Sequence, residues 1–434
     1  MRLLVGDVPS PLHGDLEIPV SKYHAHRALI LGSLAPGVTR VEGVSDARHV
    51  AFTVDALRAL GTGIETEEGI LTIRGGPYHP QRTRITFGSS GSTFYFLTGL
   101  AALADRPVTF EGQRYLRRRP VGALLGALRD LGVRLEASDG EHLPITVYPG
   151  RPRGGRVRIA GTLSQWISGL LMLAPFTRDG AIIEVDGELN ERTYVRLTVR
   201  MMAAFGLEVT VSPDERRFEV DPGQRIKPAR LVLPPDVGSA AFGLAAAAIH
   251  PGHVRFLGLT RLADHPEGTF YDVLQQMCVP LAFDDERRVA SIRQDRPRLV
   301  GATVDMRELP DMLPILAVLG SFAGGRTVLR NVAHVRLKES DRVAAMLQLR
   351  RMGARIEVEG EDLVCRGVEE LQGRAVASYN DHRVLMALAV AGSRARGTTS
   401  ISYPHAYRLS YPTFLEAMDS IGIPMRVTPP AAQA

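Results

Sequence analysis

Cysteine, tryptophan and long apolar runs are scarce in this chain, and the scarcity of cysteine and of apolar runs excludes several classes of protein. Two cysteines among 434 residues cannot form a disulfide framework, which points to a reducing compartment. The longest apolar stretches, near residues 169–176 and 243–249, fall far short of the roughly 20 residues of a membrane helix. Residues 1–14 lack an apolar core long enough for a signal peptide. We therefore expect a cytoplasmic globular protein without a membrane span.

Lysine is also rare, since only Lys22, Lys227 and Lys338 occur among the 52 basic residues. A guanidinium is always charged, whereas an ammonium can give up its proton when it is desolvated. Lys22 and Lys338 each lie within a short cluster of ionisable residues, so we look for chemistry at these two positions. Lys227 resembles a solvated loop residue, and an ordinary surface role stays open for the other two as well.

The charge balance favours small anionic ligands over nucleic acid. The net charge is +5 and the pI is near 9.3, but the arginines are mixed with acidic residues and no aromatic-rich basic stripe accompanies them. No GxxxxGKS or GxGxxG motif follows an expected strand, which argues against a P-loop kinase and a dinucleotide enzyme. A chain of 434 residues should divide into two or three domains.

A sixfold repeat organises the chain. Six amphipathic helices are each followed by a short alternating strand, and they end at Gly61, Gly132, Gly206, Cys278, Gly353 and Gly422. Neighbouring positions in this series are 69 to 75 residues apart. Glycine at a helix end can adopt a positive φ, so at Cys278 we expect a helix end outside the left-handed region. A proline-containing joint near residues 231–235 separates two lobes of three repeats, which predicts a ligand site in a cleft that closes by hinge motion.

Three segments of the first half place polar groups directly before an apolar run: residues 21–27, 89–93 and 162–166. The first brings Lys22 and Arg27 to a helix start, where anions are favoured. A serine-rich segment such as 89–93 is more often a simple helix cap, so that signal is weak by itself. The two histidines of the first segment are two residues apart and diverge on a helix, so we predict no metal site.

The second half contains a denser set of charges. Asp311 precedes a helix expected over 313–322, and its plainer interpretation is an N-cap. In the sequence RLKESDR we expect Lys338 and Arg342 to share a helix face, with Glu339 beside them. These groups form either a solvated, salt-bridged surface or part of a cationic pocket with carboxylates suited to proton transfer.

A third charged segment, Asn380-Asp381-His382-Arg383, opens a helix expected over 384–391. Arg383 adds a further cation to the proposed pocket, to which Lys22, Arg27 and Arg119 of the first half would also contribute.

These motifs, in this order and on a sixfold repeat, resemble the enolpyruvyl transferase family, in its shikimate-pathway branch. The resemblance covers essentially the full length and rests on SKxxxxR at 21–27, RRRP ending at Arg119-Pro120, Ser164-Gln165, Tyr194, LPD ending at Asp311, RxKESDR at 336–342 and YNDHR at 379–383. It implies an α/β fold of two inside-out domains, each with three βαβαββ repeats, and an active site in the interdomain cleft. It also implies an N-terminal lobe of residues 21–232 and a C-terminal lobe of residues 1–20 with 233–434.

The resemblance further implies that the enolpyruvyl (1-carboxyvinyl) group of phosphoenolpyruvate passes to an acceptor hydroxyl, with release of phosphate and no metal or organic cofactor. The family's default acceptor is shikimate 3-phosphate, in aromatic amino acid biosynthesis. Asp311, with Lys22, would take the hydroxyl proton, and Glu339 would protonate the methylene carbon. Phosphoenolpyruvate would be bound by Lys22, Gly91, Arg119, Gln165, Arg342 and Arg383. The acceptor would be bound by Arg27, Ser164, Gln165, Tyr194, Asp311, His334 and Lys338, with His382 in support.

Departures from the family pattern gather on the acceptor side, whereas Leu409 is a departure on the phosphoenolpyruvate side. Tyr23 replaces a serine and His334 an asparagine, Leu163 and Glu191 replace two serines expected around the acceptor's phosphate, and Leu409 replaces a lysine. A carboxylate at Glu191 would repel a phosphate, so the identity of the acceptor stays open.

These departures leave two alternatives to the shikimate enzyme open, and a third is disfavoured. One is a paralogue that acts on another hydroxyl, such as that of a nucleoside phosphate in specialised metabolism, and another is a ligand-binding paralogue without turnover. The UDP-N-acetylglucosamine branch is disfavoured, because its loop cysteine has no counterpart near residues 114–120. We expect a monomer, since two lobes would already enclose the site.

Overall fold

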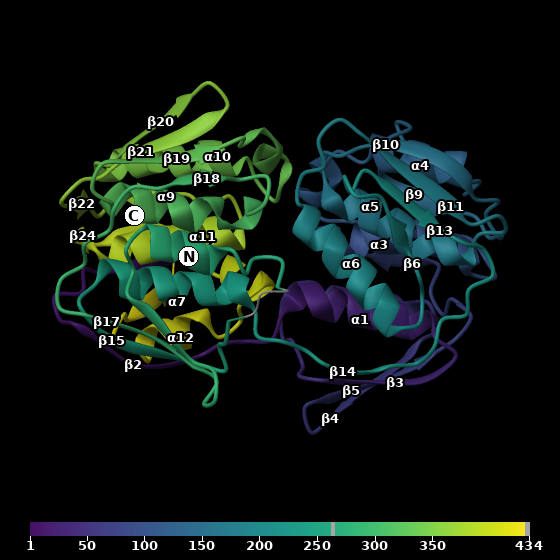
Figure 1. Ribbon diagram of the computed structural model, residues 1–434, viewed down its shortest axis with the longest axis horizontal. Helices are drawn as coiled ribbons and strands as arrows, with labels where there is room; N and C mark the ends of the chain where they lie inside the picture. The colour runs from purple at the N-terminus through teal and green to yellow at the C-terminus, as the bar shows by residue number, and fades with distance from the viewer. Residues whose placement is uncertain (262–264, 430–434) are drawn as a thin grey trace. The chain divides into compact units, whose positions relative to one another are not determined.

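The computed structural model describes residues 1–261 and 265–429, which form two compact units (Figure 1). Unit 1 contains Met1–Pro19 and Pro235–Ala434, and unit 2 contains Val20–Pro234. The chain therefore begins in unit 1, passes through the whole of unit 2 and returns at the Pro234-Pro235 pair. Among the described residues, no helix combines the length and the apolar character needed to cross a membrane.

Unit 2 contains three four-stranded sheets. In spatial order, the first consists of β14 (Arg230–Val232), β3 (Gly37–Glu42), β5 (Ile70–Gly75) and β4 (Gly63–Glu67). The second consists of β6 (Arg84–Thr86), β7 (Val108–Glu111), β9 (His142–Val147) and β8 (Leu135–Ser138). The third consists of β10 (Gly155–Ala160), β11 (Ala181–Asp186), β13 (Arg217–Val220) and β12 (Thr210–Val211).

Unit 1 repeats the arrangement over its described residues. Its sheets consist of β2 (Leu12–Glu17), β15 (Gly252–Leu257), β17 (Val289–Gln294) and β16 (Leu281–Asp284); of β18 (Thr303–Asp305), β19 (Arg326–Arg330), β21 (Asp362–Arg366) and β20 (Arg355–Glu359); and of β23 (Ala375–Val376), β25 (Thr399–Ile401), β1 (Arg2–Val5) and β26 (Met425–Thr428). A short pair, β22 (Leu371–Gln372) with β24 (Ala395–Arg396), completes the unit.

All six four-stranded sheets share one topology. The first two strands pair in parallel, as β6 with β7 and β18 with β19, and the other pairings are antiparallel. Parallel neighbours need a crossover connection, and in four of these sheets it contains an inner helix, as α3 between β6 and β7. In the other two sheets the parallel partners, β3 with β14 and β2 with β15, lie far apart in the sequence. The sixfold βαβαββ repeat predicted from the sequence is confirmed.

Helices fill the interior of each unit, and the sheets lie outside them (Figure 1). The inner helices are α1 (Lys22–Leu34), α3 (Gly91–Leu100) and α5 (Ser164–Leu173) in unit 2, and α7 (Val237–Ile249), α9 (Leu313–Phe322) and α11 (His382–Ser393) in unit 1. Every residue of α7 is buried, as is every residue of α11, which agrees with their nearly continuous apolar sequences. Each unit is thus an inside-out α/β domain, and the predicted fold of two such domains is confirmed.

A second, more exposed helix follows in each repeat. These outer helices are α2 (Arg48–Ala59), α4 (Gly122–Asp130), α6 (Arg192–Ala204), α8 (Phe270–Gln276), α10 (Arg342–Met346), which continues as a 3₁₀ segment over Leu347–Met352, and α12 (Phe414–Asp419). The glycines predicted to end them have φ between +76° and +98°, as expected for left-handed helix ends.

Cys278 corrects one prediction. We expected its helix end to lie outside the left-handed region, but its φ is +61°. The closing hydrogen bonds explain the conformation, because the amides of Cys278 and Val279 donate to the carbonyls of Gln275 and Leu274, the pattern made at Gly61 and Thr62. The Cys278 side chain is exposed, so the turn tolerates a Cβ.

Candidate active site

The predicted site residues fall into two groups, one in each unit, and several members of each group lie at helix starts. In unit 2, Lys22 and Gly91 are the first residues of α1 and α3, and Ser164 is the first residue of α5. The first amides of a helix have no partner within the helix, and the helix dipole adds partial positive charge there. Each start is therefore suited to hold an anionic ligand.

Arg27 is a buried cation in the second turn of α1. Its guanidinium donates to Thr198 Oγ1 at 2.8 Å, to the Tyr194 carbonyl at 3.1 Å and to the Tyr23 carbonyl at 3.0 Å. These acceptors are uncharged, and burial lowers the pKa of Arg27 below its ordinary value. The Tyr23 and Tyr194 rings meet edge to face, with centroids 5.1 Å apart. Tyr23, which replaces the family's serine, therefore packs against a residue predicted to bind the acceptor substrate.

Lys22 has its ammonium 5.2 Å from the centre of the Tyr23 ring, and its residue is only 7% exposed. Behind it, His26 bonds Thr53 Oγ1 at 2.7 Å, and burial keeps the pKa of His26 well below its ordinary value. Thr53 in turn bonds Thr93 of α3 at 2.7 Å. This buried chain ties the starts of α1 and α3 together through a neutral imidazole.

Gly91 and Arg119 are brought together at the start of α3. A Cβ on Gly91 would lie 2.1 Å from Arg119 Nη1, so only glycine lets the guanidinium come this close to the helix start. Ser90 accepts a hydrogen bond from the Thr93 amide and is thus the N-cap, which confirms the plainer interpretation of the serine-rich segment. Gln165 Nε2 donates to Ser92 Oγ at 3.0 Å and links α5 to α3.

Glu191 occupies the start of α5 with its own carboxylate. It is 1% exposed, has φ +62°, and accepts from the Ser164 amide at 3.2 Å and from the Ser164 hydroxyl at 2.5 Å. Leu163, the N-cap of α5, has no side chain that could do this, so Glu191 caps the helix from outside it. Because a hydroxyl has one proton, Ser164 presents lone pairs to any further partner. The hydroxyl proton of Ser164, a residue predicted to bind the acceptor substrate, is therefore already committed to Glu191.

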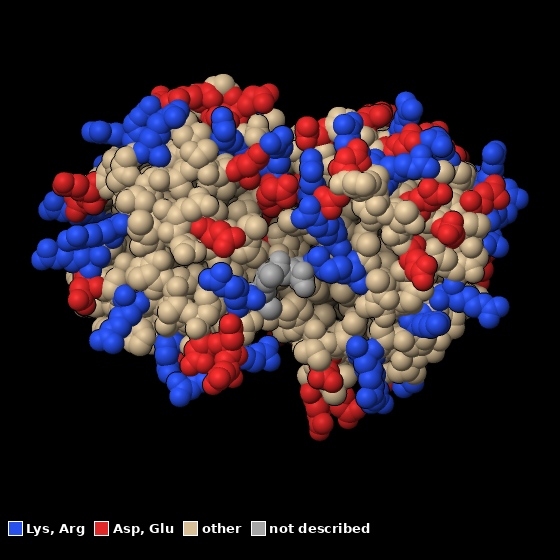
Figure 2. Space-filling view, viewed as in Figure 1, with Lys and Arg blue, Asp and Glu red and all other residues tan. Residues whose placement is uncertain are grey.

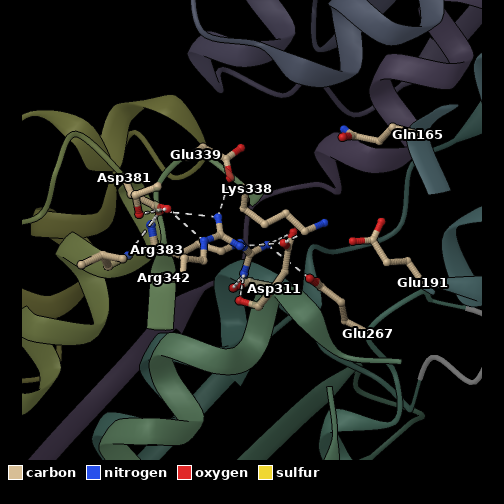
Figure 3. A network of polar contacts seen from close by, with 12 residues as sticks. Gln165, Glu191, Glu267, Asp311, Lys338, Glu339, Arg342, Asp381 and Arg383 are labelled. Atoms are coloured by element: carbon tan, nitrogen blue, oxygen red, sulfur yellow. Dashed lines mark hydrogen bonds and ion pairs between the residues drawn. The ribbon is translucent and has the colours of Figure 1, made fainter. Parts of the chain in front are cut away.

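In unit 1 a single guanidinium, that of Arg342, holds three carboxylates (Figure 3). Its three nitrogens lie 2.8 Å from Asp311 Oδ1, 2.7 Å from Glu339 Oε2 and 2.9 Å from Asp381 Oδ2. Burial by itself would lower the pKa of Arg342, but the charges of the three carboxylates outweigh it and raise the pKa. Arg342 is therefore a permanent cation that fixes the distance between two predicted proton-transfer groups.

Two local predictions about this cluster are wrong. Asp311 is not an N-cap, since it lies in a 3₁₀ turn (Pro310–Met312) and directs its carboxylate at Arg342 and, at 3.9 Å, at Lys338 Nζ. Lys338 and Arg342 do not share a helix face, because a 3₁₀ turn (Ala333–Leu337) ends before Lys338 and α10 begins only at Arg342. The extended backbone of Lys338 breaks the helix that i,i+4 spacing suggested.

Asp381 organises the start of α11. Its carboxylate accepts from the amides of Arg383 at 2.9 Å and Val384 at 3.4 Å, and also from Ser340 Oγ at 3.0 Å. It thereby caps the helix and binds Arg342 at once. Neither function was assigned to it from the sequence, although an aspartate directly before an apolar helix is a cap signal.

Arg383 projects from the first turn of α11 toward the Asp311 carboxylate and one further carboxylate, that of Glu267. Its Nη2 lies 3.3 Å from Asp311 Oδ2 and 3.2 Å from Glu267 Oε1, and its Nη1 lies 3.3 Å from the Asp311 carbonyl. Glu267 is fully buried. Sequence analysis missed Glu267, because it lies in a loop segment that carries no recognised motif.

The remaining predicted residues lie around these clusters. His334 is buried in the 3₁₀ turn that packs against the turn of Asp311, and His382 is buried as the first residue of α11. Leu409, the substituted lysine position, is 8% exposed in a 3₁₀ turn (Ala406–Leu409). Lys227 is an exposed loop residue, as predicted.

The unit 1 cluster is not cationic by itself. Lys338, Arg342 and Arg383 face four carboxylates, those of Glu267, Asp311, Glu339 and Asp381. Elsewhere, basic and acidic side chains are interspersed on the face of each unit that Figure 2 shows. Among the described residues, no three His, Cys, Asp or Glu side chains are grouped so as to hold a metal ion.

Comparison with known proteins gives a consistent result. A model of the family described as EPSP synthase (3-phosphoshikimate 1-carboxyvinyltransferase) matches residues 7–418. The 3-phosphoshikimate 1-carboxyvinyltransferase of Methanocaldococcus jannaschii is 32% identical over 98% of this chain and 100% of its own. That of Halorubrum lacusprofundi is 35% identical over 95% of this chain and 96% of its own. The EPSP synthase structure from Acinetobacter baumannii has a TM-score of 0.81 at 23% identity, over 99% of this chain and all of its own.

Proposed function

Because this chain belongs to the EPSP synthase family, we propose that it transfers the carboxyvinyl group of phosphoenolpyruvate to shikimate 3-phosphate and releases phosphate. The acceptor oxygen bonds to C2 of phosphoenolpyruvate, and the hydroxyl proton leaves to a base. C3 gains a proton from an acid, and the tetrahedral adduct then loses a methyl proton and phosphate. The enzyme is accordingly a transferase of aromatic amino acid biosynthesis.

The observation that carries this proposal is the pair of carboxylates on Arg342. The reaction needs one base for the hydroxyl and one acid for the methylene carbon, and Asp311 and Glu339 are held by two nitrogens of one buried guanidinium. We assign Asp311, with Lys22, to the hydroxyl and Glu339 to the methylene carbon. A simple binding protein would gain nothing from two carboxylates fixed in this way.

The cations and the helix starts of the site support the assignment of phosphoenolpyruvate as the donor substrate. Arg342 and Arg383 of unit 1, and Lys22 and Arg119 of unit 2, match the carboxylate and phosphate charges of phosphoenolpyruvate. Gly91 and Gln165 would add an amide and a side-chain donor at two helix starts. The location of the site between two lobes, the monomeric state and the cytoplasmic location stay predictions.

The excess of carboxylates in unit 1 agrees with an acid role for Glu339. A multiply charged anion is repelled when all four carboxylates are ionised, and the repulsion falls when one of them takes a proton.

For the acceptor, Arg27 would bind a carboxylate, and Ser164, Gln165, Tyr194, His334 and Lys338 would line the rest. The carboxylate of Glu191 at Ser164 is the specific observation that keeps a different hydroxyl compound as a second candidate for the acceptor. Both candidates share the same donor chemistry.

Phosphate release from phosphoenolpyruvate, measured with a panel of acceptors, tests the proposal. We expect release with shikimate 3-phosphate at ordinary catalytic rates. Release only with a different hydroxyl compound would replace the acceptor while keeping the reaction. Binding of phosphoenolpyruvate without release for any acceptor would overturn the proposal in favour of a ligand-binding protein.

A further inference from the structure

Glu267 is a buried carboxylate that neither the motifs nor the reaction as described above uses. It lies in the turn before α8, where its amide donates to His265 Nδ1 at 3.2 Å and its carbonyl accepts from the Phe270 amide at 3.0 Å. Its side chain is fully buried, and burying an ionised carboxylate is costly unless a cation meets it. That cation is Arg383, itself only 2% exposed.

The Glu267 carboxylate contacts the same nitrogen of Arg383 as the Asp311 carboxylate does (Figure 3). Nη2 is 3.2 Å from Glu267 Oε1 and 3.3 Å from Asp311 Oδ2, so the two carboxylates approach the same nitrogen. If Glu267 lost its charge, Asp311 would be the stronger partner of Nη2, since charge-assisted hydrogen bonds are roughly twice as strong as neutral ones. The guanidinium would then turn toward the proposed base.

Gly238, in the first turn of α7, makes room for the pair. A Cβ at this position would lie 2.3 Å from Glu267 Oε2 and 2.7 Å from Arg383 Nη2. The Gly238 carbonyl also lies 3.5 Å from Arg383 Nη1. The helix start of α7, the loop of Glu267 and the first turn of α11 therefore meet around one guanidinium.

We propose that Glu267 is a positioning residue, which holds the Arg383 guanidinium in the orientation that binds phosphoenolpyruvate and keeps it from the Asp311 carboxylate. The inference rests on the proposed function, in which Arg383 binds the donor. Glu267 acts through Arg383 and touches neither substrate.

The test compares Glu267→Gln with the unchanged protein in two measurements: the dissociation constant of phosphoenolpyruvate by calorimetry, and the KM values of both substrates. We expect Glu267→Gln to weaken phosphoenolpyruvate binding about tenfold, with the KM of shikimate 3-phosphate changed less than about twofold. Glu267→Asp, which keeps the charge, should restore donor binding to within about threefold. Glu359→Gln, in an exposed ion pair with Arg326, is the matched control and should change nothing.

Gly238→Ala provides a second variant if Glu267→Gln does not fold. Alanine favours the helix of α7 but forces the buried Glu267 and Arg383 side chains apart, so it should give the same donor-selective loss together with a modest fall in Tm. Donor binding that is unchanged or tighter in both variants would overturn the positioning role, as would equal losses for both substrates. An unchanged protein that binds phosphoenolpyruvate but releases no phosphate would count against the proposed function alone.

Discussion

At the scale of single residues, the site is built on shared partners more than on isolated pairs. Arg342 serves three carboxylates and Arg383 two, and Asp311 contributes to both sets. Groups that share a partner respond together when one of them changes. Glu→Gln substitutions, which remove a charge but keep the shape of the side chain, therefore test the roles of these groups most directly.

Glu339→Gln should abolish turnover, because the amide keeps a contact with Arg342 but cannot deliver a proton. We expect kcat to fall about a thousandfold or more, in line with the loss of a general acid. Binding of phosphoenolpyruvate, followed by calorimetry, should stay within about threefold of the unchanged protein. Full activity in this variant would remove Glu339 from the mechanism.

Glu191→Gln tests whether the carboxylate at Ser164 opposes a phosphate. The amide oxygen can still accept from Ser164, while a buried negative charge is lost. We expect the KM of shikimate 3-phosphate to fall about fivefold, because a like charge near the phosphate is gone.

Two comparisons accompany the Glu191 variant. The KM of unphosphorylated shikimate should change less than about twofold, and Glu188→Gln, on a nearby exposed ion pair, should have no effect. A higher KM for shikimate 3-phosphate in Glu191→Gln would mean that the carboxylate supports acceptor binding through Ser164.

At the scale of elements, many of the proposed site residues lie at helix starts, and a left-handed helix end recurs in each of the six repeats. Glu191, Ser90 and Asp381 cap α5, α3 and α11, and predicted substrate-binding residues lie in the first turn of each of these helices. A cap fixes the first turn of its helix and thereby the direction of the side chains on it.

The helix ends offer a matched pair of substitutions. Cys278→Gly should stabilise the protein by about 1 kcal/mol, because glycine adopts φ +61° without the steric cost that a Cβ brings. Gly353→Ala, where φ is +97° and a Cβ would meet no atom within 4 Å, should destabilise it by a similar amount. Thermal unfolding of both variants provides the check, and shifts of the same sign would contradict it.

At the scale of the whole molecule, each unit contains a buried histidine with a depressed pKa, His26 in unit 2 and His250 in unit 1. Burial lowers the pKa of His250 to about 4, and its Nε2 bonds Ser393 Oγ at 3.0 Å. Both imidazoles are therefore neutral in the folded protein near neutral pH.

The depressed pKa of His250 predicts that the folded protein loses stability as the pH falls. Below the unfolded value of 6.5 the unfolded chain takes up a proton on His250 first, so the contribution to stability is complete above pH 6.5 and is lost as the pH falls toward 4. The loss from His250 amounts to about 3 kcal/mol over that window. Denaturant unfolding between pH 7 and 4 should show a shallower decline in His250→Gln than in the unchanged protein. His405→Gln, which removes an exposed imidazole, is the control, and parallel profiles for all three proteins would contradict the prediction.

The repeat, the helices and the chemical class of the chain were determined by local sequence. Residues 313–322 were predicted as a helix and form α9, and five of the six expected helix ends adopt the predicted conformation, because apolar periodicity and terminal glycine act within a few residues. The charge balance of the sequence likewise favours small anionic ligands.

Tertiary structure decided which of these groups meet. The cap on α5, the contacts of Arg342 with Asp311 and Asp381, and the pairing of Glu267 with Arg383 join residues 27, 31, 39 and 116 positions apart. Tertiary packing also overruled a local preference, the N-cap expected at Asp311. Hydrogen bonds and ion pairs of this kind depend on distances of about 3 Å between side chains on different elements. Sequence spacing fixes such distances only within one helix or strand, so the partners of the buried charges emerged only from the packing of inner helices and their loops.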